Sequence, residues 1–305
     1  RFLTGMGSCL TLGSKNAVAD IFVDTGGGAT NAAVTFANLD IPVSCLTRVG
    51  DDLFGREVQR VLKEKKVKTD LLQVDKTRPT SYSTLLMISS GQRSILAYRG
   101  ASNFIELPAP SPSNSPSGRG RKMADWFYIT SLGGNIKLLD KIFNFAEKNK
   151  IKIAWNPGGG ELKLGLERLR KYIARVEVFN VNREEAAELC GAKYEEMGVM
   201  IKKLSGASPR VVITDGGNGA FVLYNNELWF AATLGTKPVS TTGAGDAFGS
   251  AFCAGLILKH DMDFALRLAI LNSDGVIREM GAKNGLLEKL PSERDLKKVK
   301  IHLVK

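Results

Sequence analysis

The sequence predicts an α/β fold built on a mainly parallel central sheet. Short apolar runs alternate with amphipathic stretches along the chain, which is typical of strands that alternate with helices. Four of these runs also end at polar residues, and parallel strands deliver such residues to one crevice at their carboxyl ends. We expect residues 1–305 to form a single large domain.

The composition is that of a soluble globular enzyme, with 44% hydrophobic and 24% charged residues among 305. No apolar run approaches the roughly 20 residues needed to span a bilayer. Residues 1–5 lack the apolar core of a secretory signal. We therefore expect a cytoplasmic protein with no membrane partner. The four cysteines are scattered, so neither a disulfide framework nor a zinc site is predicted.

The net charge of +11 raises the question of nucleic-acid binding. Lysine and arginine are spread along the chain and form no basic motif interleaved with aromatic residues. The cluster Lys63, Lys65, Lys66 and Lys68 is interpreted as one solvated helix end. Nucleic acid is therefore not an expected partner, whereas a basic surface could steer ATP or an acidic sugar towards a site.

Residues 80–99 predict a hairpin, because two apolar runs flank a central Ser-Gly-Gln. Residues 108–122 are too rich in proline, serine and glycine to bury a core, so we expect a mobile loop. Apolar residues recur at helical spacing over 136–148, which predicts a crossover helix with one buried face. Residues 220–224 and 227–232 predict a second hairpin that turns at two asparagines.

Four apolar runs predict parallel strands: 126–129, 151–155, 176–179 and 211–213. The last three lead to Asn156, Asn182 and Thr214, respectively. Each polar residue taken singly is an ordinary strand-end cap. Together they favour a shared site at the carboxyl edge of the sheet.

The segment 239–249 joins a glycine-rich turn to an apolar run that looks helical. Gly243, Ala244 and Gly245 let the backbone aim several N–H groups at one point, and such a helix start binds anions. Asp246 then lies where its carboxylate can accept a proton from a hydroxyl that attacks a bound phosphate. The structural alternative is an ordinary turn in which Asp246 is a favourable first-turn charge.

Three motifs together resemble the ribokinase-like (PfkB) carbohydrate kinases. The first is Thr241-Thr242-Gly243-Ala244-Gly245-Asp246, the second is Gly26-Gly27-Gly28-Ala29-Thr30-Asn31, and the third is Asn182-Arg183-Glu184-Glu185. They occur in the order and approximate spacing of that family. The resemblance covers the chain from about residue 20 to residue 290.

The resemblance implies a three-layer ribokinase-like fold with a small β-sheet lid. The lid would comprise strands from about residues 7–24 and the hairpin 80–99, and would cover the sugar. In that family the lid often mediates dimerisation, so a homodimer through the lid is one option.

The resemblance also implies ATP-dependent phosphorylation of a primary hydroxyl on a sugar or sugar acid, as in a ribokinase, a fructokinase or a 2-keto-3-deoxygluconate kinase. Asp246 would be the general base, and Gly243, Ala244 and Gly245 would form the anion hole. Glu185 would belong to the Mg²⁺ environment. The expected substrate residues are Gly26, Gly27, Asn31 and Arg99, and the expected nucleotide residues are Asn156, Asn182, Thr214, Gly216, Gly219 and Asn272.

Two departures from the family pattern matter. The family usually has aspartate at the position of Ser240, where it helps to build a monovalent-cation site, so potassium activation is in doubt. Family members also open with a strand whose aspartate binds the sugar, whereas this chain begins within the expected lid. We expect either a truncated N-terminus or a substitute in Asp20 or Asp24.

Three other functions remain open. A nucleoside kinase is the nearest, and aromatic residues that stack a base in the lid pocket would favour it. A dinucleotide-dependent oxidoreductase is suggested by Gly243, Gly245 and Gly249, but Phe248 occupies the last glycine position of the Rossmann fingerprint. A non-catalytic ligand-binding protein on the same fold is the third, since Ser240 could mark degeneration.

Overall fold

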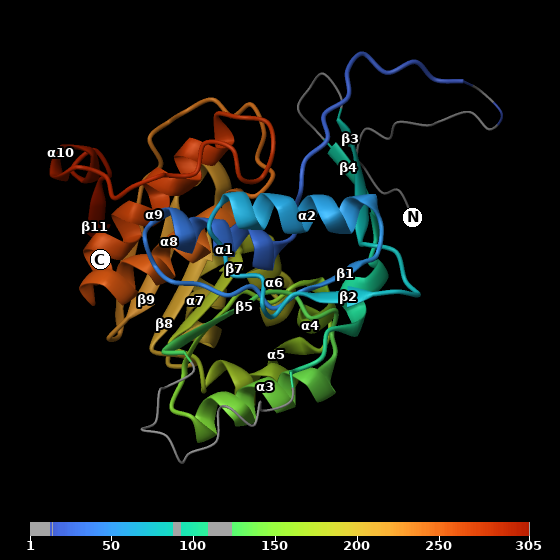
Figure 1. Cartoon of the computed structure of the whole chain (residues 1–305). Coiled ribbons are helices and arrows are strands. Elements are labelled where there is room, and N and C mark those ends of the chain that lie inside the picture. Colours follow the sequence, from blue (N-terminus) through green and yellow to red (C-terminus); the bar gives the residue numbers. More distant parts are fainter. Residues whose placement is uncertain (1–12, 14, 88–92, 109–123, 305) are drawn as a thin grey trace.

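The computed structural model describes residues 13, 15–87, 93–108 and 124–304. Apart from residue 108, the expected mobile loop 108–122 lies outside these residues, as do residues 7–12 of the expected lid. Figure 1 shows a central sheet with helices on both sides and, at one edge of the molecule, the separate strands β3 (Tyr82–Met87) and β4 (Arg93–Tyr98).

The central sheet has seven strands in the order β11-β10-β9-β8-β7-β6-β5. The neighbouring strands β5 to β8 are all parallel, and they bring their carboxyl ends to one edge. The strands β9 to β11 extend the sheet in antiparallel pairs. The bounds are Trp126–Ile129 (β5), Lys152–Trp155 (β6), Val178–Asn182 (β7), Arg210–Thr214 (β8), Ala220–Tyr224 (β9), Glu227–Ala231 (β10) and Ile301–Leu303 (β11).

Alternate residues of the central strands enter different hydrophobic clusters, which shows that the sheet is covered on both faces. Val211 and Ile213 pack in one cluster, and Val212 between them packs in the other. The first layer contains α3 (Ile136–Lys148), α4 (Gly159–Leu162), α5 (Gly165–Ile173), α6 (Arg183–Cys190) and α7 (Met197–Leu204). The opposite layer contains α1 (Gly28–Asn38), α8 (Ala244–Lys259) and α9 (Met262–Ile277). The predicted three-layer α/β class is confirmed.

Two local predictions agree with the structure in detail. Helix α3 spans the predicted range, and its buried residues are those that recur at helical spacing. The hairpin β9–β10 turns at Asn225 and Asn226, whose φ angles are 51° and 63°. Positive φ at both central residues is the type I′ geometry that suits a two-residue hairpin, and asparagine tolerates it.

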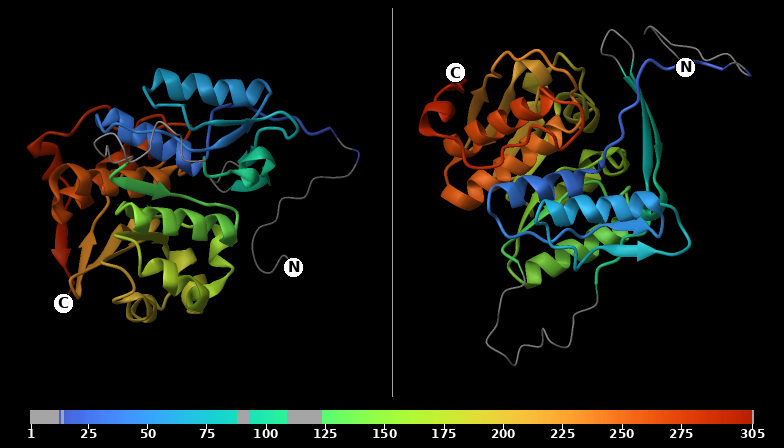
Figure 2. Two further views of the ribbon diagram at one scale, coloured as in Figure 1. Left: turned by 60° about the horizontal axis from the view of Figure 1, so that its bottom comes forward. Right: turned by 45° about the horizontal axis from the view of Figure 1, so that its top comes forward.

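The hairpin predicted at 80–99 forms a separate antiparallel sheet of β3 (Tyr82–Met87) and β4 (Arg93–Tyr98). The strands expected within 7–24 are absent from the described part of that range, residues 13 and 15–24. In the described chain no third strand pairs with this hairpin, so residues 15–24 lack the ladder that would make them a strand. Figure 2 shows this segment leaving the body of the molecule in extended form.

The remaining elements of the described chain are a short parallel strand pair, one helix and three short helical turns. Strands β1 (Arg48–Gly50) and β2 (Gln73–Asp75) form a parallel pair, and α2 (Leu53–Glu64) lies between them in the sequence. Short turns of helix occur at η1 (Gly100–Phe104), η3 (Gly216–Asn218) and α10 (Glu293–Leu296).

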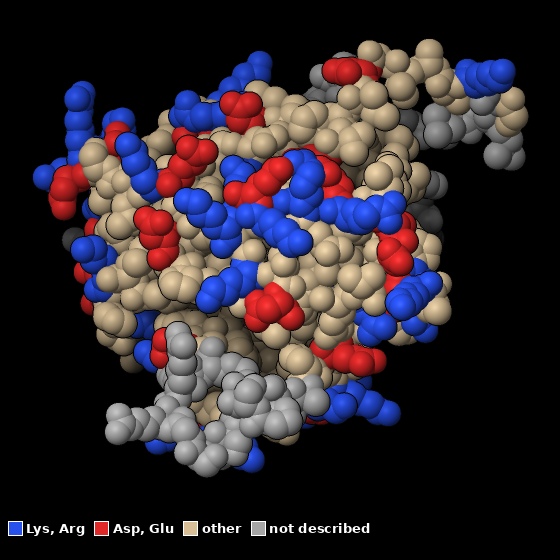
Figure 3. Space-filling view, viewed as in Figure 1, with Lys and Arg blue, Asp and Glu red and all other residues tan. Residues whose placement is uncertain are grey.

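The surface charge is mixed. On the face in Figure 3, lysine and arginine gather around α2 but are interspersed with acidic residues, and Arg60 of this helix pairs with Glu57 and Glu64. No helix in the described residues is long and apolar enough to cross a membrane.

Candidate active site

A cavity of about 200 Å³ opens at the carboxyl edge of the parallel strands. It gathers residues that the sequence spreads over 90 positions, from the ends of β6, β7 and β8 and from the starts of α6 and α8. The lining consists of Asn156, Asn182, Glu185, Thr214, Gly243, Gly245 and Asp246. Each of these was a candidate from the sequence, so the structure brings one residue set together at the predicted crevice.

The glycine-rich turn at this cavity requires glycine at position 243. Gly243 has φ of 83°, and a Cβ built on it would lie 2.7 Å from the Cα of Ala282. The turn leads directly into α8, whose first N–H groups have no acceptors within the helix. Such an N-terminus favours a negatively charged ligand.

Asp246 lies in the first turn of α8 and faces the first turn of α1. Its Oδ2 accepts a hydrogen bond of 2.7 Å from Nδ2 of Asn31. A Cβ built on Gly28 would lie only 3.1 Å from Oδ1 of Asp246. The backbone of Gly28, which has no side chain, therefore lies directly against the carboxylate. Burial raises the pKa of Asp246, while the Asn31 hydrogen bond and the positive charge of Lys283 lower it. The net shift of the Asp246 pKa is upward, because burial outweighs these two partners, both of which favour the ionised carboxylate.

Lys283 is a site residue that sequence reasoning missed. Its ammonium donates to the carbonyl oxygen of Thr25 and to Oδ1 of Asn31, both at 2.7 Å. Burial lowers the pKa of Lys283 to about 8, against the charges of Asp24, Asp246 and Cys45. A single lysine does not form a motif that sequence analysis could recognise. The only local sign of a special position is the pair of nearby glycines, Gly281 and Gly285, both with positive φ.

Asn182 and Glu185 form a capping box at the start of α6. The backbone N–H of Glu185 donates to Oδ1 of Asn182, and the backbone N–H of Asn182 donates to Oε2 of Glu185, both at 2.8 Å. Burial raises the pKa of Glu185, the bond from Asn182 lowers it, and the nearby carboxylates of Glu184, Asp246 and Glu188 raise it. A cation near Glu185 would relieve the repulsion among these carboxylates.

The donor set suits Mg²⁺ held largely by phosphates and water. Among the described residues, no group of three His, Cys, Asp or Glu side chains is placed to hold a metal ion. Glu185 contributes a carboxylate to the cavity wall, and only one of its two oxygens, Oε2, accepts a hydrogen bond in the capping box. Mg²⁺ commonly binds through one or two carboxylates together with substrate phosphates, so the residues present fit that ion.

The loop after β8 carries two further candidates, Gly216 and Gly219, which belong to the turn around η3 and do not line the cavity. Gly219 has φ of 120°, and a Cβ on it would lie 2.2 Å from the carbonyl oxygen of Ala231, so its role here is close packing. The loop is fixed to the start of α6 by an ion pair of 2.7 Å between Arg183 and Asp215.

Asn272 does not lie at the cavity, contrary to the prediction. It is 0% exposed, and its Nδ2 donates to the carbonyl oxygen of Ala247 at 2.9 Å. Its Oδ1 accepts from the backbone N–H of Leu287 at 2.9 Å. Because both ends of the amide are spent on backbone groups, Asn272 supports the first turn of α8 and has no free group for a nucleotide.

The expected substrate residues fall into two groups. The carbonyl oxygens of Gly26 and Gly27 accept from the Thr30 hydroxyl at 2.7 and 3.0 Å, which fixes the turn before α1 and the position of Asn31. Arg99 lies between β4 and η1, outside the cavity lining.

Ser240, at the position where the resembled family has aspartate, is buried. Its hydroxyl oxygen accepts from the backbone N–H of Thr242 at 3.2 Å. Asp20 and Asp24, the suggested substitutes for a sugar-binding aspartate, each accept from the next backbone N–H at 2.7 Å.

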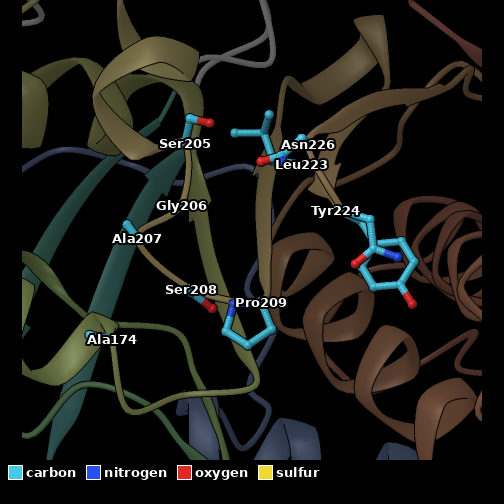
Figure 4. Close-up of a pocket in the computed structure, with 10 residues that line it drawn as sticks. Ala174, Ser205, Gly206, Ala207, Ser208, Pro209, Leu223, Tyr224 and Asn226 are labelled. Carbon is cyan, nitrogen blue, oxygen red and sulfur yellow. The ribbon is translucent and has the colours of Figure 1, made fainter.

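A larger cavity, of about 380 Å³, lies at the opposite end of the sheet, beside the start of β8 and the β9–β10 turn. Figure 4 shows the segment Ser205–Pro209 on one side of it and Leu223, Tyr224 and Asn226 on the other. Its lining is Ala174, Ser205, Gly206, Ala207, Ser208, Pro209, Leu223, Tyr224, Asn225 and Asn226. The described residues of its lining include no carboxylate, lysine or histidine, and Tyr224 is the one among them with an ionisable side chain.

Comparison with known proteins finds similar sequences and similar folds. The ribokinase of Lactococcus lactis subsp. lactis is 28% identical over 300 residues, covering 93% of this chain and 89% of that protein. The solved structure of Burkholderia thailandensis nucleoside kinase with inosine has a TM-score of 0.73 at 17% identity, covering 92% of this chain and 88% of the other. Giardia lamblia ribokinase has a TM-score of 0.72 at 18% identity, covering 94% and 92%.

These structural likenesses confirm the predicted ribokinase-like fold. The model of the pfkB family of carbohydrate kinases matches residues 8–289. That match spans all three motifs and the whole of the cavity lining. The chain therefore belongs to the pfkB carbohydrate kinases, a family of ATP-dependent kinases, as its motifs predict.

Proposed function

We propose that the protein transfers the γ-phosphate of ATP to a primary hydroxyl of a sugar or sugar acid. The observation that carries this proposal is that one cavity is lined by the Asp246 carboxylate, the Gly243–Gly245 turn and the Asn182–Glu185 capping box. A base, an anion-binding helix start and a carboxylate for a cation are the parts that phosphoryl transfer requires.

In this proposal Asp246 is the general base. The acceptor hydroxyl oxygen forms a bond to the γ-phosphorus, the bond from that phosphorus to the bridging oxygen of ADP breaks, and the hydroxyl proton passes to Asp246. Only the ionised carboxylate can accept it, and the Asn31 hydrogen bond favours that form. Asn31 thereby serves the base, in addition to the expected contact with the sugar.

The backbone N–H groups of Gly243, Ala244 and Gly245 would stabilise the negative charge on the transferred phosphoryl group. A helix N-terminus supplies this stabilisation without reorganisation during the reaction, because its dipoles are fixed by the fold. Glu185 would help to hold Mg²⁺, which neutralises phosphate charge when it is bound. Asn156, Asn182 and Thr214 would contact the nucleotide from the strand ends.

The acceptor would enter between the start of α1 and the β3–β4 hairpin. Gly26, Gly27 and Asn31 lie at the start of α1, and Arg99 follows the hairpin, where its charge suits a sugar acid. The hairpin is apolar and exposed, with Ile95 and Leu96 on adjacent positions and so on opposite faces. One face is then free to cover the acceptor and the other to contact a second copy.

A nucleoside acceptor is the second candidate, because the hairpin carries exposed aromatic rings. Tyr82 and Tyr98 are paired across β3 and β4, and the ring of Phe54 lies 5.0 Å from that of Tyr82. Aromatic faces of this kind can stack a nucleobase.

The test is ATP- and Mg²⁺-dependent release of ADP across a panel of sugars, sugar acids and nucleosides. Asp246→Asn is the control, since an amide cannot accept the proton. Selective turnover with one sugar that is lost in this variant supports the proposal. Turnover of nucleosides alone supports the second candidate, and ligand binding without turnover supports a non-catalytic binding protein.

A further inference from the structure

Lys283 is a buried cation that the proposed reaction does not itself require. It is 5% exposed and lies in the loop after α9, between Gly281 and Gly285. An ammonium group in such a place loses much of its hydration, so it must be held by close acceptors. Its acceptors are Thr25 and Asn31, more than 250 residues away in the sequence.

The loop that carries Lys283 packs directly on the anion-binding turn. Ala282 lies against Gly243, as the 2.7 Å approach to a Cβ built there shows. Gly281 lies against Asp24, with a built Cβ 2.3 Å from that carboxylate. Glycine at position 281, with φ of 101°, allows this approach. Backbone packing therefore fixes the position from which the lysine side chain reaches α1.

The orientation of the Asn31 side-chain amide is determined by the two charged groups that it contacts, Lys283 and Asp246. Lys283 occupies Oδ1, so the NH₂ group is turned towards Asp246, where it donates at 2.7 Å. The reversed amide would place an NH₂ group against the ammonium and a carbonyl oxygen against the carboxylate. Both contacts would be repulsive, so the lysine charge selects one orientation.

We propose that Lys283 is a positioning residue of the phosphoryl-transfer centre, which orients Asn31 so that its NH₂ group donates to the Asp246 carboxylate. The inference rests on the proposed role of Asp246 as the base. The same ammonium holds the carbonyl oxygen of Thr25, and so joins the Gly26–Gly27 turn to the base from a third segment. The groups that face Lys283 are the carboxyl groups of Asp24 and Asp246 and the thiol of Cys45, whose pKa burial raises to about 12.

The test follows the Asp246 carboxyl directly. Protein with ¹³C-labelled aspartate carboxyl groups is titrated by NMR, and the Asp246 signal is assigned by its absence in Asp246→Asn. Lys283→Met removes the charge but keeps an unbranched side chain. Lys203→Met is the matched control, because Lys203 on α7 also donates to a backbone carbonyl, that of Cys190.

The expected result is a pKa of Asp246 that rises by about one unit or more in Lys283→Met, a tenfold change in proton affinity. The acid limb of the kcat profile should move by the same amount, and Lys203→Met should change neither. An unchanged Asp246 titration in folded Lys283→Met overturns the inference. If Lys283→Met does not fold, Lys283→Gln replaces it, because a neutral amide must also raise the pKa.

A double-variant cycle tests the path through Asn31. Asn31→Leu has nearly the same shape and removes both hydrogen bonds. Lys283→Met should therefore shift the Asp246 titration less in that background, where only the direct effect of the lysine charge is left, than in the wild type. Full additivity would show that the lysine acts on Asp246 without Asn31, and would overturn the inference. If the proposed function is wrong, the wild-type protein shows no turnover. The NMR titration does not depend on turnover, so it still decides the role of Lys283.

Discussion

Gly243 and Gly245 belong to one motif, yet alanine should have opposite effects at the two positions. Gly243 has φ of 83°, where an L-residue costs roughly 1–2 kcal/mol. Its new Cβ would also lie 2.7 Å from both Cα and Cβ of Ala282, and such overpacking against backbone costs about 1–3 kcal/mol. Gly243→Ala should therefore lower the free energy of unfolding by about 2–5 kcal/mol.

Gly245→Ala is the matched comparison. A Cβ at position 245 meets nothing within 4 Å, and the residue lies inside α8. Alanine there should leave stability unchanged or raise it by up to about 1 kcal/mol, because alanine favours the helix. Any loss of turnover in this variant then reports on the cavity wall and not on the fold.

The assay is urea unfolding followed by circular dichroism, with the free energy extrapolated to water for both variants and the wild type. Wild-type stability in Gly243→Ala would refute the reasoning, since it would mean that Ala282 moves away freely. Equal losses in both would refute it as well, since position 245 would then be as crowded as position 243.

Four further predictions follow from the site and its surroundings. Lys283 loses its proton above about pH 8 in the folded protein, whereas an unfolded lysine holds its proton to about pH 10.5. Between these two pH values the free energy of unfolding should therefore rise with pH, while kcat should fall. Neither trend should occur in Lys283→Met. Gly28→Ala should lower kcat more than it raises KM, because a Cβ would lie 3.1 Å from Oδ1 of Asp246. Turnover should be the same in potassium and in choline buffers, since Ser240 offers no carboxylate for a cation; activation by potassium would contradict this. Sedimentation should find a homodimer that Leu96→Lys converts to monomer, because Leu96 is 61% exposed on the hairpin.

The parts of the fold that repeat a local pattern were predictable from the sequence. The range of α3 and the Asn225-Asn226 turn follow from spacing and from backbone preference alone. Strand ends were predictable to within about three residues, and the polar residues that follow them were enough to locate the crevice.

The errors arise where a residue's role depends on partners distant in the sequence. Asn272 looks like any polar residue in an amphipathic helix, and only the packing of α9 against α8 shows that its amide is consumed. The strands expected in 7–24 needed a ladder partner that residues 15–24 do not have in the described structure. Lys283 carried no signal beyond its nearby glycines, because the acceptors that hold it lie near the other end of the chain.

The bond between Asn31 and Asp246 joins residues that are 215 positions apart. Helices α1 and α8 must both be docked on the sheet before it can form, and the Lys283 loop must close over them. No local segment that folds early contains a competent base, so a partly folded chain should have no phosphotransferase activity. During refolding, turnover should therefore recover only when the last long-range docking step is complete. This recovery should be later than the recovery of helix content.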